Sequence, residues 1–111
     1  MRERDIQDRI RALGHGDLRL FRNNVGSAQT TDGRFIRFGL APGSPDLIGW
    51  KRITITPDMV GTTVAVTVGI EVKNLGGRTR ADQQRFIAHM QDFGCRAGIA
   101  HSVEEAHDII A

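Results

Sequence analysis

The stretch TTVAVTVGIEVKN, residues 62–74, decides the fold because two kinds of residue alternate strictly along it. Its even positions are branched and apolar, and they are Val64, Val66, Val68, Ile70 and Val72. Its odd positions include Glu71 and Lys73. A period of two is typical of a β-strand with one face against a core. We therefore predict a strand whose valine face is buried and whose opposite face carries Glu71 beside Lys73.

The segment before this strand predicts a hairpin partner for it. Residues 46–55, DLIGWKRITI, read as a second strand, and TPDMVG, residues 56–61, reads as the turn. If the turn is centred between Asp58 and Met59, Asp46 lies opposite Glu71. Two facing carboxylates destabilise a sheet unless a cation lies between them, which favours a hard divalent ion bound by oxygen. A register shift of one residue would turn Asp46 to the other face, and a shift of two would leave it diagonal to Glu71.

The part of the chain before the hairpin predicts one helix and two short strands. Residues 2–14, RERDIQDRIRALG, place apolar side chains at helical spacing and end on a glycine. Residues 17–44 contain strand-like pieces at 18–22 and 34–40, joined by loops rich in Gly, Asn and Thr. A helix followed by strands is therefore expected upstream of the hairpin.

The part after the hairpin predicts a helix, a strand and a last helix. Thr79 is a candidate cap for a helix that ends at Gly94. A short strand, AGIAHS, follows at residues 97–102, and a capping box of Ser102 and Glu105 opens a last helix at residues 103–110. The whole pattern predicts one α/β (α+β) domain over residues 1–111, with elements roughly in the order αβββαβα.

Composition restricts the classes of protein that fit. A chain of 111 residues suits one small domain, and no apolar run is long enough to span a bilayer. The first twelve residues are too charged for a signal peptide, and Cys95 has no second cysteine for an internal disulfide. We therefore expect a cytoplasmic protein without a membrane partner or an organic cofactor.

Arginine dominates the basic residues, 13 of 15. The planar guanidinium group suits phosphate better than the point charge of lysine, which hints at nucleic acid. A solvated surface of mixed charge is the alternative, because several arginines alternate with aspartate along the first helix.

Two polar side chains fall on apolar helix faces. Glu3 lies on the apolar stripe of the first helix, and Gln83 precedes Phe86 and Ile87 by three and four residues. The first position predicts a glutamate that faces the core, and the second predicts an amide directed toward the sheet.

Each polar candidate also has an ordinary structural explanation. Glu3 is also explained as a frayed terminal residue, Asp46 as the end of a loop and Gln83 as a hydrogen bonder on a helix flank. Glu71 and Lys73 are also explained as a surface pair. Their joint occurrence favours a site over five separate coincidences.

Five segments together resemble the VRR-NUC domain, the virus-type replication-repair branch of the PD-(D/E)XK nuclease superfamily. They are ERDI (3–6), LFRNNVG (20–26), GSPDLIGW (43–50), IEVK (70–73) and TRADQQRF (79–86). The resemblance covers nearly the whole chain and implies a restriction-endonuclease-like core, with a central mixed β-sheet flanked by helices. It also implies the small standalone form associated with bacteriophages or prophages, acting in the cytoplasm of a bacterial host.

The resemblance implies roles for particular residues. Metal ligands for Mg²⁺ or Mn²⁺ would be oxygen atoms of Glu3, Asp46, Glu71 and the Val72 carbonyl. The catalytic group would comprise Asp46, Glu71 and the lysine Lys73, with Gln83 as the helix residue that supports the lysine.

DNA contacts are expected from the remaining polar positions. Backbone amides and guanidinium groups at the start of the 79–93 helix suit a phosphate, and further arginines lie upstream. The candidates are Arg22, Asn24, Arg34, Arg37, Arg78 and Arg80. No segment stands out as an element that reads bases, which favours recognition of DNA shape.

The expected function is that of a metal-dependent, structure-selective DNA endonuclease of the Holliday junction resolvase type, in phage replication or repair. Cutting two strands requires two active sites, so we expect a homodimer, and the apolar end of the last helix, Ile109 and Ile110, is either interface or core. The alternatives are a non-specific or restriction-like nicking endonuclease, an inactive nucleic-acid-binding module on the same fold, and an unrelated protein with a structural metal.

Overall fold

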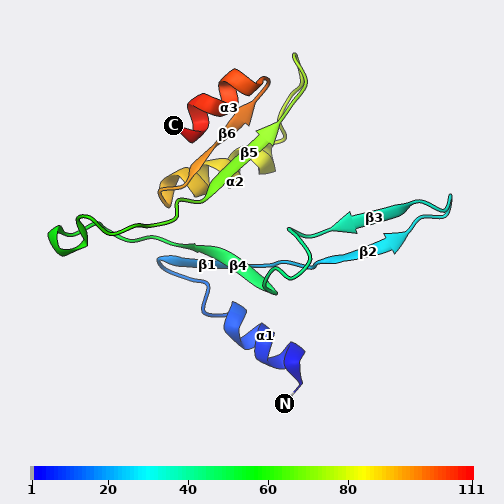
Figure 1. Cartoon of the computed structure of the whole chain (residues 1–111), viewed down its shortest axis with the longest axis horizontal. Helices are drawn as coiled ribbons and strands as arrows, with labels where there is room; N and C mark the ends of the chain where they lie inside the picture. Colours follow the sequence, from blue (N-terminus) through cyan, green and yellow to red (C-terminus); the bar gives the residue numbers. More distant parts are fainter. Residues whose placement is uncertain (1) are drawn as a thin grey trace. The chain divides into compact units, whose positions relative to one another are not determined.

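The computed structural model describes residues 2–111 and shows a mixed α/β fold, as expected, with three α-helices and three two-stranded sheets. The elements are α1 (Glu3–Arg11), β1 (Leu18–Arg22), β2 (Gly26–Gln29), β3 (Phe35–Phe38), β4 (Leu47–Lys51), the 3-10 helix η1 (Pro57–Met59), β5 (Val68–Val72), α2 (Ala81–Asp92), β6 (Arg96–Ala100) and α3 (Val103–Ile110). They are labelled in Figure 1. The chain forms two compact units, Met1–Lys51 and Arg52–Ala111, called unit 1 and unit 2 below.

Unit 1 consists of α1 and two antiparallel strand pairs. β1 pairs with β4 so that Leu18 aligns with Lys51 and Arg22 with Leu47. Gly49 lies at the centre of β4, and a side chain there would meet the Arg19 carbonyl oxygen at 1.8 Å, so only glycine permits this close approach. β2 and β3 form a separate hairpin.

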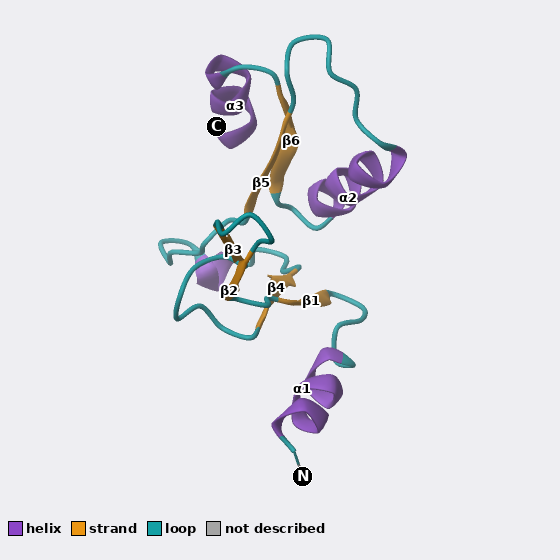
Figure 2. Ribbon diagram, turned by 90° about the vertical axis from the view of Figure 1, so that its right-hand side faces the viewer, coloured by secondary structure: helices purple, strands orange, loops and turns teal. Residues whose placement is uncertain are grey.

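Unit 2 is built around the parallel pair of β5 and β6. Val68 aligns with Arg96 and Val72 with Ala100. Helices α2 and α3 lie on opposite faces of this pair, as Figures 1 and 2 show. Gly69 faces Met90 of α2, and Gly98 faces Ile109 of α3, so a residue without a side chain permits close packing on each face.

The buried apolar residues of the described chain all belong to unit 2, and they are Met90, Phe93, Cys95, Ala97 and Ala100. The prediction of a buried valine face is wrong: Val68 is 46% exposed and Val72 is 75% exposed. Each face receives a helix: α2 packs on the face of Gly69 and Glu71, where glycine leaves room for the Met90 side chain, and α3 packs on the face of Ile70, where Ile109 meets Gly98.

The predicted hairpin register is also wrong for the strands described. β4 has its partner in β1, and Glu71 of β5 aligns with Ile99 of β6. Residues 52–67 lie outside any strand. A two-residue turn fixes the register of a hairpin, but a connection of this length leaves each strand free to pair within its own unit.

Other expectations differ in detail. Five strands, not three, precede α2, and the strands form small sheets where the resemblance implies one central sheet. The cap of α2 is Arg80, one residue after the predicted Thr79. The Ser102 cap of the last helix is confirmed, since Glu105 N donates to Ser102 Oγ at 3.1 Å, but the Glu105 side chain accepts from His101 N at 3.4 Å, so the reciprocal bond of a capping box is not formed with Ser102 N.

No helix within residues 2–111 combines the length and the apolar character that crossing a lipid bilayer requires.

Candidate functional site

Glu71, Lys73 and Gln83 form a connected polar group in unit 2. Glu71 lies on β5, and Lys73 follows two residues later, directly after the end of the strand, where its N–H still bonds to Ala100 O of β6; the two side chains therefore lie on one face. Lys73 Nζ is 3.2 Å from Glu71 Oε1, and the two side chains are only 20% and 32% exposed, respectively. Gln83 Nε2 donates to the same carboxylate oxygen at 2.9 Å. The predicted direction of the Gln83 amide, toward the sheet, is thus confirmed.

The first turn of α2 fixes the orientation of the Gln83 amide. Arg80 N donates to Gln83 Oε1 at 3.0 Å, so the amide oxygen closes the start of the helix while its nitrogen reaches Glu71. Gln83 N donates in turn to Asp82 Oδ1 at 2.9 Å. The side-chain amide of Gln83 is therefore held at its oxygen by Arg80 N and at its nitrogen by Glu71, and this restricts the rotation of the Glu71 carboxylate.

Asp82 and Arg80 form an exposed ion pair at the same helix end, with Arg80 Nε 3.1 Å from Asp82 Oδ1. The hydrogen bond from the Arg80 side chain lowers the pKa of Asp82, against a smaller desolvation effect. An ionised carboxylate at the N-terminus of a helix is favourable because it opposes the positive end of the helix dipole.

A pocket of about 400 Å³ opens between β5 and α2. Glu71 and Gln83 supply its polar wall, and Phe86 and Met90 supply its apolar wall. The shared carboxylate is therefore accessible to a small ligand or ion.

The Val72 carbonyl points away from β6. Thr67 O accepts from Arg96 N, and Lys73 N donates to Ala100 O, so the odd-numbered residues of β5 direct their backbone groups toward β6. The backbone groups of adjacent strand residues point to opposite edges, which places the carbonyl of Val72 at the other edge of β5.

Asp46 lies in unit 1, exposed, immediately before β4. Its position depends on the buried side chain of Asn23, which is 8% exposed. Asn23 N donates to Asp46 O at 2.8 Å. The Asn23 Nδ2 atom donates to Ser44 Oγ at 2.7 Å and to Pro45 O at 2.8 Å, and Asn23 Oδ1 accepts from Leu40 N at 3.0 Å. These four bonds form a polar clamp on the loop that precedes Asp46.

Sequence reasoning selected Asn24 and missed Asn23. Asn24 is exposed, whereas Asn23 holds the loop. A signal was available, because Asn23 lies two residues after the half-buried Phe21 and therefore follows the inward face of β1. An asparagine offers both donors and an acceptor, which suits it to fix irregular backbone.

Glu3 is exposed at the start of α1, in unit 1. The expectation that it faces a core is wrong. The apolar stripe of α1 on which Glu3 lies is itself exposed to solvent, because Ile6 and Ile10 are 46% and 42% exposed and α1 has no buried residue.

The candidate DNA-binding arginines fall into two groups. Arg34 and Arg80 are paired with aspartates two residues away, Asp32 and Asp82. Within residues 2–111 the other three form no ion pair, and they are Arg22, Arg37 and Arg78. Arg37 lines a pocket of about 270 Å³ in unit 1, and Arg78 lines one of about 390 Å³ in unit 2.

The donor set fits a hard divalent cation. Both hydrogen-bonded contacts to the Glu71 carboxylate use Oε1, which leaves Oε2 and the Val72 carbonyl as oxygen donors. No group of three or more His, Cys, Asp or Glu side chains in the described part of the chain is placed to hold a metal ion. Mg²⁺ commonly binds through one or two carboxylates and keeps several waters, so it does not require such a group.

The VRR-NUC domain family model matches residues 3–104. Neither the curated proteins nor the solved structures contain a significant match to the chain. The family match runs through both units and includes every polar residue described above except those of the last helix. Because it covers nearly all of the 111 residues, this chain belongs to the VRR-NUC family of nucleases, which are of the PD-(D/E)XK type.

Proposed function

We propose that the chain is a Mg²⁺- or Mn²⁺-dependent endodeoxyribonuclease that selects branched DNA, in the manner of a Holliday junction resolvase in phage replication or repair. The family makes it a nuclease with DNA as substrate, and nucleases of this type generally use divalent metal ions. The observation that carries the proposal is the Glu71 carboxylate, which Lys73 and Gln83 hold through a single oxygen.

Four groups would hold the cation, through oxygen atoms of Glu3, Asp46, Glu71 and the Val72 carbonyl. A bound Mg²⁺ or Mn²⁺ ion makes a water molecule more acidic and stabilises the negative charge that develops on phosphorus. Glu71 contributes a carboxylate whose orientation is already restricted before the ion arrives, and such restriction by neighbouring donors raises metal affinity.

Lys73 acts on the phosphate and the attacking water in this proposal. Its ammonium group lies against Glu71 and is mostly covered, so it presents a positive charge at a fixed place beside the carboxylate. A cation in that position balances the added charge of the transition state and donates a hydrogen bond to the attacking water or to a phosphate oxygen.

Gln83 acts through Glu71 and not on the substrate. Because its amide also closes the start of α2, a displacement of the helix would release the carboxylate. This makes Gln83 a positioning residue for the site.

Selection of branched DNA is supported by the kind of contacts available. Exposed arginines read the phosphate backbone and carry no sequence information of their own. A resolvase must also cut two strands symmetrically, which one subunit with one site cannot do, so the proposal includes a homodimer. On α3, Ile109 packs over Gly98, while Ile110 is 49% exposed and is the better candidate for an interface.

Cleavage assays test the proposal. The wild type, Lys73→Ala and Asp46→Ala are each incubated with a synthetic four-way junction, a linear duplex and supercoiled plasmid, in Mg²⁺ or Mn²⁺. Lys51→Ala is the matched control, because Lys51 is the only other lysine and lies exposed at the end of β4. We expect wild type and Lys51→Ala to cut the junction and not the linear duplex, and the other two variants to be inactive.

Two outcomes would contradict the proposal. Equal cutting of junction and duplex would favour a restriction-like nicking enzyme. Junction binding by the wild type without cleavage in either metal would favour an inactive binding module. Calorimetric titration of Mg²⁺ and Mn²⁺ into wild type and Glu71→Gln, with and without DNA, measures metal binding separately from cleavage.

A further inference from the structure

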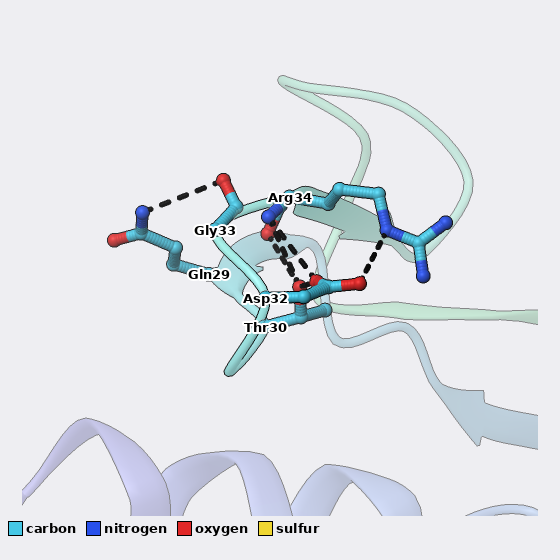
Figure 3. A network of polar contacts seen from close by, with 5 residues as sticks. All are labelled: Gln29, Thr30, Asp32, Gly33 and Arg34. Atoms are coloured by element: carbon cyan, nitrogen blue, oxygen red, sulfur yellow. Dashed lines mark hydrogen bonds and ion pairs between the residues drawn. The ribbon is translucent and has the colours of Figure 1, made fainter.

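The β2–β3 hairpin in unit 1 ends in a turn that polar contacts hold together, and Figure 3 shows this network. Thr30 N donates to Arg34 O at 2.7 Å, and the Thr30 hydroxyl donates to the Asp32 carboxylate. Arg34 Nε donates to Asp32 Oδ2 at 2.9 Å, and Gly33 takes the positive φ of 88° that the turn requires. The tip is therefore braced in one conformation.

One face of the hairpin combines an exposed aromatic ring with polar neighbours. Phe35 is 74% exposed and aligns with Gln29 across the hairpin, and Arg37 aligns with Ser27. Residues that alternate along a strand share a face, so Phe35 and Arg37 lie on the same side. An aromatic ring flanked by an amide and a guanidinium group is the combination that binds nucleic acid bases and phosphates.

The opposite face of β3 has a different character. Ile36 aligns with Ala28, and the Phe38 ring lies over Gly26 at a distance that would exclude any side chain there. That face is apolar and lacks charge, so the two faces of one strand offer a matched comparison.

The charge of the segment complements DNA. Residues 22–40 contain three arginines and one aspartate, a net charge of +2 that equals the formal charge of the whole chain. The rest of the chain is therefore neutral overall. A cationic arm with an exposed ring suits a polyanion with stackable bases better than it suits an apolar protein surface.

The base of the hairpin is tied to the loop that carries Asp46. The Asn23 side chain accepts from Leu40 N, just after β3, and donates to Pro45 O, while its backbone donates to Asp46 O. A nucleotide held by the hairpin would therefore have a fixed relation to Asp46.

We infer that the β2–β3 hairpin is the arm that recognises branched DNA, with Phe35 stacked on an unpaired or end-stacked base at the branch point and Arg37 on a neighbouring phosphate. The inference rests on the proposed function for its substrate. It goes beyond that proposal by naming Phe35 as a specificity-determining residue.

Binding in EDTA tests the inference without cleavage. Fluorescence anisotropy measures the Kd of wild type, Phe35→Ala and Ile36→Ala for a labelled four-way junction and for a linear duplex of equal length. Loss of one stacked base predicts a Kd about 10-fold higher for Phe35→Ala on the junction and an unchanged Kd on the duplex. Ile36→Ala, on the other face and 53% exposed, is expected to match the wild type on both DNAs.

Two further variants separate stacking from apolar burial and from charge. Phe35→Trp retains a stacking ring and is expected to keep junction affinity, whereas Phe35→Leu is expected to lose it. Arg37→Ala is expected to weaken binding to both DNAs and to reduce the salt slope by about 1, as removal of one phosphate contact does.

The inference is overturned if Phe35→Ala binds the junction as the wild type does while its circular dichroism spectrum is unchanged. It is also overturned if Phe35→Ala loses a dimer that the wild type forms in sedimentation, because the ring would then belong to a subunit interface. A wild type that binds the junction but cuts no DNA would contradict the proposed function and leave the hairpin inference unaffected. A Phe35→Ala variant that cuts with unchanged junction preference would contradict the hairpin inference and leave the proposed function unaffected.

Discussion

Different interactions stabilise the interior of unit 2 and the interior of unit 1. Unit 2 buries five apolar side chains where α2 and α3 pack on the β5–β6 pair. Within residues 2–51 the single buried side chain is that of Asn23, a polar residue. Apolar burial is non-directional and adds up with area, whereas a buried asparagine contributes only while its bonds are made.

This difference means that the candidate residues of the two units depend on different interactions. Glu71, Lys73 and Gln83 lie on elements that a packed core supports. Asp46 lies on a loop that one polar side chain holds in place. Loss of core packing should therefore disturb the first group, and loss of hydrogen bonds should disturb Asp46.

The largest effect is expected from Met90→Ala. Met90 is 6% exposed and fills the space over Gly69, so truncation leaves a cavity between α2 and β5. Such core truncations cost about 2–5 kcal/mol. Urea unfolding followed by far-UV circular dichroism measures the loss. Leu75→Ala is the control, because Leu75 is 94% exposed and should change stability by less than about 0.5 kcal/mol. Equal losses for both variants would show that the packing on Gly69 does not support unit 2.

The polar clamp is tested by Asn23→Ala, with an expected cost of about 1–3 kcal/mol. The substitution removes three side-chain hydrogen bonds, and it leaves the Ser44 hydroxyl, the Pro45 carbonyl and the Leu40 amide without the partner that Asn23 supplies. Hydrogen exchange should accelerate at the Leu40 amide, which loses its acceptor, and not at the amides of β6. Asn24→Ala is the matched control at the exposed neighbouring position. If both variants exchange alike at Leu40, the loop before Asp46 has another support.

The structural features that can be predicted from the sequence also differ between the two units. In unit 2, the last helix and its Ser102 cap follow directly from local signals, because caps and helix ends are decided by a few adjacent residues. The direction of the Gln83 amide toward the sheet follows from helical spacing, but its partner there, Glu71, was not predicted. The core side of β5 could not be predicted from alternation, since Gly69 lets α2 pack on the face without valines.

In unit 1 three of the four strands are predicted from the sequence, with β2 (Gly26–Gln29) missed, but the contacts that hold the strands in place are not predicted. Residues 18–22 form the strand expected, with the same bounds. The role of Asn23 depends on bonds to residues 17 to 23 positions away, which no local pattern encodes. Long-range pairing likewise decides the partner of β4. The turn expected at residues 56–61 is present and contains η1, but residues 52–56 and 62–67 on either side of it form no strand, so no hairpin joins β4 to β5.

A smaller effect, on activity, is expected from Gln83→Ala. The variant frees the Glu71 carboxylate to rotate while keeping its charge and its contact with Lys73. Loss of an outer hydrogen bond of this kind reduces metal affinity or activity by about 10–100-fold. Cleavage rates at a series of Mg²⁺ concentrations measure it, and a higher metal requirement is the expected signature. Gln84→Ala is the control, since the Gln84 amide donates to Thr79 Oγ1 and not to Glu71. A Gln83→Ala enzyme with wild-type metal dependence would rule out the positioning role.

The smallest expected effect is the pH dependence that Cys95 gives to the stability of unit 2, and it tests whether water reaches the core of that unit. Burial raises the pKa of the Cys95 thiol above its ordinary value of 9.0, more than the Thr67 hydrogen bond lowers it. The unfolded thiol therefore loses its proton first as the pH rises. The contribution of Cys95 to stability is complete below pH 9 and declines as the pH passes from 9.0 toward the higher folded pKa, by at most about 1.4 kcal/mol per pH unit.

The pH profile of Cys95→Ala isolates this effect from all other titrating groups. In reducing buffer, the difference in unfolding free energy between wild type and Cys95→Ala is expected to be constant from pH 7 to 8 and to shrink above pH 9. Asn23 does not titrate, so hydrogen exchange at the Leu40 amide, corrected for its intrinsic pH dependence, should keep its protection over the same range. A difference that stays constant through pH 10 would mean that water reaches the Cys95 thiol in the folded state. The interiors of unit 2 and unit 1 would then differ less than their buried residues indicate, because water would reach interior groups in both units.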